Sequence, residues 1–425
     1  MRIKNLHLEN FRGFEKLDIE FPKDSNVAVF IGENGSGKTT ILDALRENFA
    51  VFFRLELSHN LDLNSYRNEA NIKQGSSNYI IHSIVEQDNK TNISIQSPSK
   101  NSKFSQLISG GTGGIEIEEN TNIPILAYFG SKIYSFTNGE LPKVPFKQLL
   151  ANYNALNAPL SNFEDFLTWF KNEKNRQDRL KISTSDLNYV SKEITVVSDA
   201  ISKFLNGLSN NRFEKFRLET IDLPREHIYD SRTQDFLVIN KDNLLFEINS
   251  LSAGEKILVQ LVADISRRLT LANPSLDNPL EGTGIILIDE IELHLHPKWQ
   301  RNSIPALTKT FPNIQFIITT HSPQVLSYVP NGSAFSVENG NVYPVNSYGR
   351  DNEWILETIM NDIDRPKEIK VKLDELFDLI RNNHIEKAKQ LRSEIATLIG
   401  EDEAELLKAD ILIQRKNRAV LYEAH

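Results

Sequence analysis

The chain has 425 residues, 40% of them hydrophobic and 25% charged, which is typical of a soluble globular protein with a large core or a sizeable insertion. Its formal net charge of −9 at pH 7 excludes a general DNA-coating protein, although a local basic groove remains compatible with it. The absence of cysteine excludes disulfides, thiolate metal sites and cysteine nucleophiles.

The N-terminal residues form no apolar segment of the kind that directs secretion. No stretch approaches the roughly 20 apolar residues that span a bilayer. We therefore expect a cytoplasmic protein that does not enter a membrane.

Three strands are predicted near the N-terminus. Apolar alternation in residues 1–21 predicts two strands joined by a turn at Gly13. The β-branched run at 26–32 predicts a third strand that ends at a glycine. A polar glycine-rich loop follows, and then a helix over residues 39–53.

The loop between this third strand and the helix, GENGSGKTT (32–40), matches the phosphate-binding pattern G-x-x-x-x-G-K-S/T in the required strand–loop–helix context. Its glycines allow backbone amides to face phosphate oxygens, and the helix dipole adds to the attraction. Lys38 supplies a positive charge to the terminal phosphates, and the Thr39 hydroxyl is a ligand for Mg²⁺. The predicted phosphate-binding residues are Gly32, Asn34, Gly35, Ser36, Gly37, Lys38, Thr39 and Thr40.

The middle of the chain changes character twice. Residues 55–120 are polar and broken, so we expect loops around short strands, followed by a buried strand at 123–130. Residues 145–215 carry apolar side chains at helical spacing and predict two amphipathic helices. These helices either pack on the body of the protein or bind a partner.

Residues 235–250 are predicted to be strands, and LSAGEK (251–256) opens the next helix with a serine, a small residue and a glycine. Such a helix end offers a hydroxyl, free amides and a positive dipole to an anion, although an ordinary helix cap has the same appearance.

The stretch GIILIDEIELHLHP (284–297) is a buried strand that ends in two carboxylates. Asp289 lies at the carboxyl end of this strand, where open α/β sheets bind ligands, and can hold Mg²⁺ through water, while Glu290 can polarise an attacking water. The alternative is a protein-bound metal held by His294 and His296 with a carboxylate, but the sequence suggests no third ligand nearby.

A further strand at 314–323 ends in Thr320 and His321, where a histidine can reach a γ-phosphate or the attacking water. The C-terminal hundred residues mix strand and helix patterns. Two amphipathic helices within 366–398 are expected to turn at Asn382 and Asn383.

The order of phosphate loop, LSAGEK, acidic strand and strand-end histidine resembles the ABC-type ATPases of the branch that includes SMC proteins, RecF and OLD nucleases. The opening LHLENFRGFEKLDIEF (6–21), the signature LSAGEK and the Walker B and D-loop region IDEIELHLHP carry this resemblance. In that branch two heads sandwich two ATP molecules, and the signature of one head caps the γ-phosphate held by the other.

The resemblance implies a role for each matching residue. Asp289 serves Mg²⁺ together with Thr39, Glu290 is the general base and His321 is the switch histidine. The signature residues that act in trans are Ser252, Gly254 and Glu255. Phe11 and Arg12 stand where the N-terminal loop of the family approaches the nucleotide, and YFGS (128–131) is our choice for the Q-loop region.

The predicted fold class is α/β: an ABC-type P-loop NTPase head with a mostly parallel sheet, a long mixed insertion and a helical tail. We expect the head at residues 1–50 and 236–330, the insertion at 51–235 with a helical part at 145–215, and a mainly helical extension at 331–425. The insertion is too short for the long coiled coil of SMC-type repair proteins.

Nothing after His321 resembles a nuclease site, and the tail resembles the stand-alone ATPases of bacterial anti-phage defence, such as the ATPase subunit of Septu systems, also found with some retrons. That resemblance implies ATP and Mg²⁺ as cofactors, a head-to-head dimer or higher oligomer, and a separately encoded nuclease such as an HNH protein as partner. Nucleic acid is a further candidate ligand, bound directly or through the partner. The alternatives are a RecF-like DNA-repair clamp and a scaffold that ATP locks with negligible turnover.

Overall fold

The computed structural model describes residues 1–56, 71–87, 91–97, 108–109, 117–130, 146–152, 154–159, 164–209, 212–222, 233–362 and 365–423. The chain divides into two compact units, Met1–Ile355 and Leu356–His425. Each unit is built around its own hydrophobic core. No helix in the described ranges is both long enough and apolar enough to cross a bilayer.

A seven-stranded sheet forms the centre of the first unit, in the order β15-β14-β3-β13-β12-β7-β8. Every neighbouring pair is parallel except β14 and β15, which form an antiparallel hairpin at one edge. The strands are β3 (Val27–Ile31), β7 (Ile125–Gly130), β8 (Ala158–Pro159), β12 (Gly284–Ile288), β13 (Ile314–Thr320), β14 (Ala334–Glu338) and β15 (Asn341–Val345). Strands β3, β7, β12 and β13 are buried along their whole length, as expected of a parallel sheet covered on both faces.

A second, antiparallel sheet has the order β2-β1-β4-β5-β6. Its strands are β1 (Arg2–Phe11), β2 (Phe14–Glu20), β4 (Ile80–Gln87), β5 (Thr91–Ser97) and β6 (Ile108–Ser109). Helix α1 (Lys38–Glu56) packs against strands of both sheets, so it lies between them. Buried Gln315 on β13 also joins the sheets, because its amide accepts from the Ile3 nitrogen at 2.7 Å and donates to the Ile3 oxygen at 3.1 Å.

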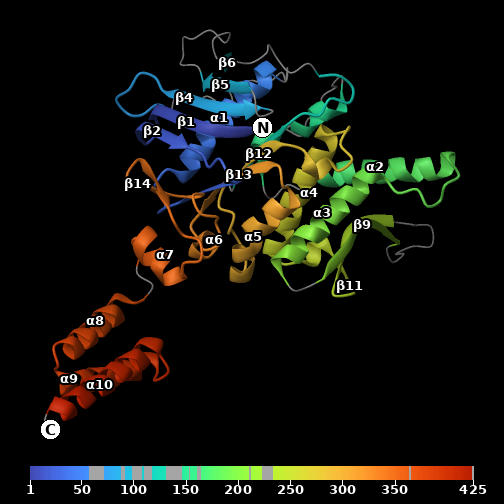
Figure 1. Cartoon of the computed structure of the whole chain (residues 1–425). Coiled ribbons are helices and arrows are strands. Elements are labelled where there is room, and N and C mark those ends of the chain that lie inside the picture. The colour runs from blue at the N-terminus through green and yellow to red at the C-terminus, as the bar shows by residue number, and fades with distance from the viewer. Residues whose placement is uncertain are drawn as a thin grey trace. The chain divides into compact units, whose positions relative to one another are not determined.

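Three helices pack together on the side of β12 and β13 that faces away from β1 and β4 (Figure 1). They are α3 (Lys192–Leu208), α4 (Ala253–Ala272) and α5 (Pro297–Thr310). Helix α2 (Glu164–Ser183) and a small antiparallel sheet of β9 (Phe213–Asp222), β10 (Thr233–Lys241) and β11 (Leu244–Glu247) adjoin them. The short helices are η4 (Lys147–Asn152), η5 (Ala155–Asn157), η6 (Ile248–Ser250), η7 (Pro279–Glu281) and α6 (Pro323–Leu326).

Helices α2 and α3 occupy the region where two amphipathic helices were predicted. Helix α3, however, begins later in the chain than the apolar pattern indicated. Leu187 and Val190 precede α3 and are exposed, at 78% and 58%. The buried face of α3 begins only at Val197. Phe163, which began the predicted pattern, lies outside the described residues.

The domain boundaries differ from the prediction in two places. Strands from the predicted insertion at 51–235 belong to both large sheets of the first unit, since β4 pairs with β1 and β7 lies inside the parallel sheet. The head also extends past residue 330, because β14 pairs with β3 and is buried over four of its five residues. The compact helical unit begins only at Leu356.

The second unit begins within α7 (Asn352–Ile359) and contains α8 (Lys367–Arg381), α9 (Ile385–Ile399) and α10 (Ala404–Glu423). The predicted turn lies between α8 and α9, where Asn383 has a left-handed φ of 60°. The guanidinium of Arg392 on α9 binds both carboxylate oxygens of Asp410 on α10, at 3.0 and 2.8 Å. Leu376 on α8 is fully buried in the core of this unit.

Replacing Leu376 by alanine should destabilise the second unit by about 2–5 kcal/mol, because it removes a buried side chain and leaves a cavity. Hydrogen exchange of the backbone amides in α8, α9 and α10 would report the loss of protection. Leu407→Ala is the matched control, since Leu407 on α10 is 50% exposed and its loss should cost less than about 0.5 kcal/mol. Equal loss of protection in both variants would contradict this packing.

Candidate functional site

The phosphate-loop sequence lies between β3 and α1, at the carboxyl end of the parallel sheet. Gly35 and Gly37 have φ angles of 81° and 112°, which side chains rarely allow. A Cβ atom on Gly37 would also lie 2.6 Å from the ring of Phe14. The loop therefore needs glycine at these positions both for its conformation and for its packing.

The other residues of the loop surround this turn. Asn34 is exposed and Gly32 is buried, while Ser36 and Thr40 are half-buried. The Ser36 hydroxyl oxygen is itself buried and makes no hydrogen bond to another described residue. An orphaned buried hydroxyl inside a glycine-rich loop fits a site that receives an anion.

Lys38 folds back over its own loop. Its ammonium group donates to the carbonyl oxygens of Gly32 and Glu33, each at 2.8 Å. Burial lowers the pKa of Lys38 to about 8, although the charges of Asp289, Glu292 and Glu290 oppose that shift. A phosphate group would give this buried cation the counter-charge that the carbonyls cannot supply.

Thr39 and Asp289 meet although 250 residues separate them, because β3, β13 and β12 are consecutive neighbours in the sheet. The Thr39 hydroxyl lies 3.1 Å from both carboxylate oxygens of Asp289, and the hydroxyl of Thr319, on β13, donates to one of them at 2.6 Å. Burial raises the pKa of Asp289, and the two hydroxyls oppose that shift. A threonine hydroxyl beside a buried carboxylate is a donor set that suits Mg²⁺.

Glu290 and His321 follow β12 and β13 at the same edge of the sheet. The backbone nitrogen of Glu290 donates to the Thr319 hydroxyl at 2.9 Å, and Glu290 has a left-handed φ of 54°, an outlier typical of functional turns. Burial and the charge of Lys38 lower the pKa of His321, although the nearby carboxylates oppose the shift. This shift in pKa favours the neutral form of the His321 ring.

Phe11 and Arg12 differ from each other in their placement. The ring of Phe11 is fully buried and packs on Tyr79 at 5.2 Å, so it faces the core and not a ligand, contrary to expectation. Arg12 is 34% exposed, pairs with Asp43 of α1 at 2.6 Å and donates to Asn71 at 2.8 Å. Because Asp43 follows the phosphate loop by one helical turn, Arg12 stays near the nucleotide site.

The signature sequence caps α4. The Ser252 hydroxyl accepts from the Glu255 nitrogen at 3.3 Å, and the Glu255 carboxylate accepts from the Ser252 nitrogen at 2.9 Å, which is a capping box. Lys241 donates to Glu255 at 2.7 Å. Burial alone would raise the pKa of Glu255, but the hydrogen bonds from Lys241 and Ser252 outweigh burial and lower it. Glu255 therefore acts here as a cap.

Gly254 packs against the segment that follows β12, because a Cβ atom on it would lie 2.5 Å from the His294 carbonyl oxygen. Beside this contact is a cavity of about 530 Å³, within the usual range for ligand pockets. Its lining includes signature residues together with His294, His296 and Trp299. The signature and the two histidines therefore share one pocket.

The alternative of a protein-bound metal at His294 and His296 finds no support among the described residues, where no group of three or more potential ligands is placed to hold a metal. His296 instead caps α5, since its Nδ1 atom accepts from the Lys298 nitrogen at 3.2 Å.

The segment predicted as the Q-loop begins at the end of β7. The carbonyl oxygen of Phe129 accepts from the Asp289 nitrogen at 2.8 Å, so this strand ends beside the carboxylate of the site. Residues 131–145, and with them Ser131 of the predicted YFGS, lie outside the described residues.

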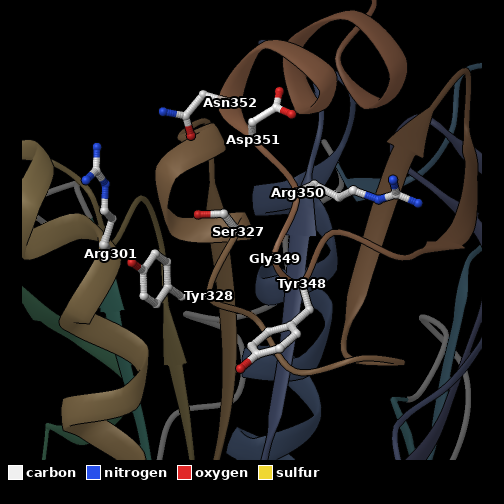
Figure 2. Close-up of a pocket in the computed structure, with 8 residues that line it drawn as sticks. All are labelled: Arg301, Ser327, Tyr328, Tyr348, Gly349, Arg350, Asp351 and Asn352. Atoms are coloured by element: carbon white, nitrogen blue, oxygen red, sulfur yellow. The ribbon is translucent and has the colours of Figure 1, made fainter.

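A second pocket of about 480 Å³ lies beyond α6, where Arg301, Ser327, Tyr328 and the segment 348–352 surround it. Figure 2 shows Arg301, Tyr328 and Tyr348 around this hollow, with the Arg350 side chain directed away from it. The guanidinium of Arg350 lies 4.4 Å from the ring centroid of Trp354, which accounts for its orientation. Arg301 donates to Gln324 at 3.0 Å, so the pocket adjoins the short segment that follows His321.

Comparison with known proteins gives matches along most of the chain. The family model described as "AAA domain, putative AbiEii toxin, Type IV TA system" matches residues 27–327. The retron Ec83 probable ATPase of Escherichia coli is 29% identical over 98% of this chain and 87% of its own length. The retron Vc95 probable ATPase of Vibrio cholerae is 32% identical over 77% of this chain and 72% of its own length.

The Septu protein PtuA of Bacillus mycoides is 26% identical over 79% of this chain, which spans 40% of that relative. The matched family region begins at β3, just before the phosphate loop, and ends just after His321, so it contains the Walker and signature residues described above. The chain belongs to this AAA-domain family.

Proposed function

We propose that the protein is an ATPase that binds Mg²⁺ and ATP at the phosphate loop and works in bacterial anti-phage defence. One observation carries the chemistry: Thr39 and Thr319 both bind Asp289 beside Lys38, where three neighbouring strands end. The retron and Septu relatives, matched along most of this chain, favour defence over DNA repair.

The residues of the site divide the proposed reaction between them. Lys38 would exchange its carbonyl partners for phosphate oxygens, and Thr39 and Asp289 would hold the Mg²⁺ ion. The ion would neutralise charge on the transferring phosphate. Glu290 would take a proton from the attacking water, and the neutral His321 ring would orient that water or the terminal phosphate.

The signature would act on a second copy of the chain. Ser252 lies at the start of α4, where backbone amides and the helix dipole favour an anion, and it faces a cavity larger than a single phosphate needs. We therefore propose a head-to-head dimer in which the Ser252 end of one copy meets the terminal phosphate bound by the other.

We further propose that the ATP state of this dimer controls a separately encoded effector, for which a nuclease of HNH type is our first candidate. Nucleic acid would then be contacted by the effector, by this chain or by both. The two-unit organisation supports this proposal, because a helical unit with its own core can serve a partner without entering the ATP site.

Glu290→Gln should retain ATP binding but hydrolyse ATP about 10²–10⁴-fold more slowly, because the amide keeps the size of the side chain and loses the proton acceptor. Phosphate release under saturating ATP measures the rate, and titration with a fluorescent ATP analogue measures the affinity. An undiminished rate would assign the base elsewhere, and a wild-type protein without turnover would favour an ATP-locked scaffold.

Nucleotide affinity should be flat below pH 8 and fall at higher pH, by up to about tenfold per pH unit. The pKa of Lys38 is about 8 in the free protein, and bound phosphates favour its charged form, so binding above that pH must take up a proton. Titrations between pH 7 and 9.5 test this dependence. Lys38→Arg is the control, because a guanidinium stays charged throughout this range and should remove the dependence.

Mixing a Ser252→Arg chain with a Lys38→Ala chain should restore ATPase activity that neither shows alone. Each mixed dimer would contain one intact phosphate loop facing one intact signature. With random pairing the activity should approach about one quarter of the wild-type value. Activity in the Ser252→Arg protein alone would argue that the signature does not act in trans.

A further inference from the structure

Glu292 joins the strand-end histidine to the segment that carries the proposed base. One of its carboxylate oxygens accepts from the Thr320 hydroxyl at 2.7 Å, and the other accepts from the His321 backbone nitrogen at 2.5 Å. Glu292 itself lies two residues after Glu290. Both oxygens of this carboxylate are thus engaged by two consecutive residues at the end of β13.

The Thr320 hydroxyl shows why an acceptor is needed there. Thr320 is fully buried, and its oxygen already accepts from the Ser322 nitrogen at 3.0 Å. Its single proton must therefore find an acceptor, and Glu292 supplies it. Without Glu292, a buried hydroxyl and the backbone N–H of His321 would both lose their partner, which is costly inside a protein.

Glu292 is also close to the proposed catalytic groups. Its charge acts on the pKa of Lys38 and on that of His321, favouring the protonated form of each. The same carboxylate therefore binds the backbone of His321 and favours the charged form of the lysine in the phosphate loop. Neither the sequence patterns nor the family motifs assign it a role.

We propose that Glu292 is a positioning residue, which fixes His321 beside Lys38 so that the imidazole meets the terminal phosphate or the attacking water. This inference rests on the proposed ATP hydrolysis. The hydrogen bonds carry it, because they fix where the chain turns after β13 while leaving the imidazole free to act. Glu292 acts on its own phosphate loop and not on that of a second copy.

Glu292→Ala should lower the turnover rate by about 10- to 100-fold and change nucleotide affinity by less than about threefold, because a shift of 1 Å in a catalytic group can cost about 10² in rate. Glu292→Gln should recover part of this loss in rate, since its oxygen can still accept from the His321 nitrogen, whereas its NH₂ group cannot accept the Thr320 proton. Glu20→Ala, an exposed glutamate on β2, is the control and should leave both quantities unchanged.

Thermal unfolding of the same variants separates positioning from a purely structural role. A structural role predicts that Glu292→Ala lowers the melting temperature and the affinity together, with Glu292→Gln no better in rate. Unchanged turnover in an active Glu292→Ala protein would overturn the inference and leave the proposed function standing. A wild-type protein without ATPase activity would instead overturn the proposed function.

The mixed dimer tests on which copy Glu292 acts. Glu292→Ala added to the Ser252→Arg chain shares a chain with the only intact phosphate loop, and the restored activity should fall by the same 10- to 100-fold. Added to the Lys38→Ala chain, it should leave the restored activity unchanged. A loss confined to the Lys38→Ala arrangement would show that Glu292 acts across the interface, and equal losses would show that both copies matter. Either result would contradict the proposal.

Discussion

The bond between Thr319 and Asp289 organises the candidate site. Thr319 donates its hydroxyl proton to Asp289 and accepts from the Glu290 nitrogen, so one buried side chain of β13 sets the position of both acids that follow β12. Thr39 reaches the same carboxylate from the phosphate loop. The three segments can meet in this way only because β3, β13 and β12 are consecutive neighbours in a parallel sheet.

The electrostatics of the candidate site, where β3, β13 and β12 end, explain why this site suits a polyanion bound together with a metal ion. A buried lysine with a lowered pKa lies among carboxylates, one of which has a raised pKa. Desolvation disfavours the charged form of each group, and within the described part of the chain neither group forms an ion pair. A metal ion would favour the charged form of Asp289, and phosphate oxygens would favour that of Lys38, so a ligand that brings both would stabilise the site as a whole.

The sequence predicted which residues gather at the candidate site because the motifs are local. The phosphate loop, the acidic strand and the strand-end histidine each combine a buried run with polar residues at its end, and the structure brings Lys38, Thr39, Asp289, Glu290 and His321 to one edge of the sheet. What the sequence missed depends on long-range pairing. Thr319 looked like an ordinary strand residue, and Glu292 acquires its role only through β13.

Phe11 shows a second limit of prediction from the sequence. Its place in the family pattern suggested a contact with nucleotide. Strict alternation from buried Leu6 and Leu8 would point to Asn10, but the left-handed φ of 52° at Asn10 interrupts the alternation, and Phe11 is the buried residue. The differences from the predicted boundaries near residue 330 and within the insertion have another cause. Strands such as β4 and β14 gain their place only from partners far away in the sequence, and no local signal gives the partner of a strand.

The contact between Gly254 and the His294 carbonyl has a consequence for how the signature can be probed. Any side chain at position 254 would first force helix α4 away from the segment after β12, because a Cβ atom would lie 2.5 Å from that oxygen. Loss of activity on replacing Gly254 could therefore result from disrupted packing between α4 and the segment after β12, even if no nucleotide contacts this position. Ser252 is exposed at the start of α4, so a substitution there can separate recognition of a ligand from packing, which a substitution of Gly254 cannot do.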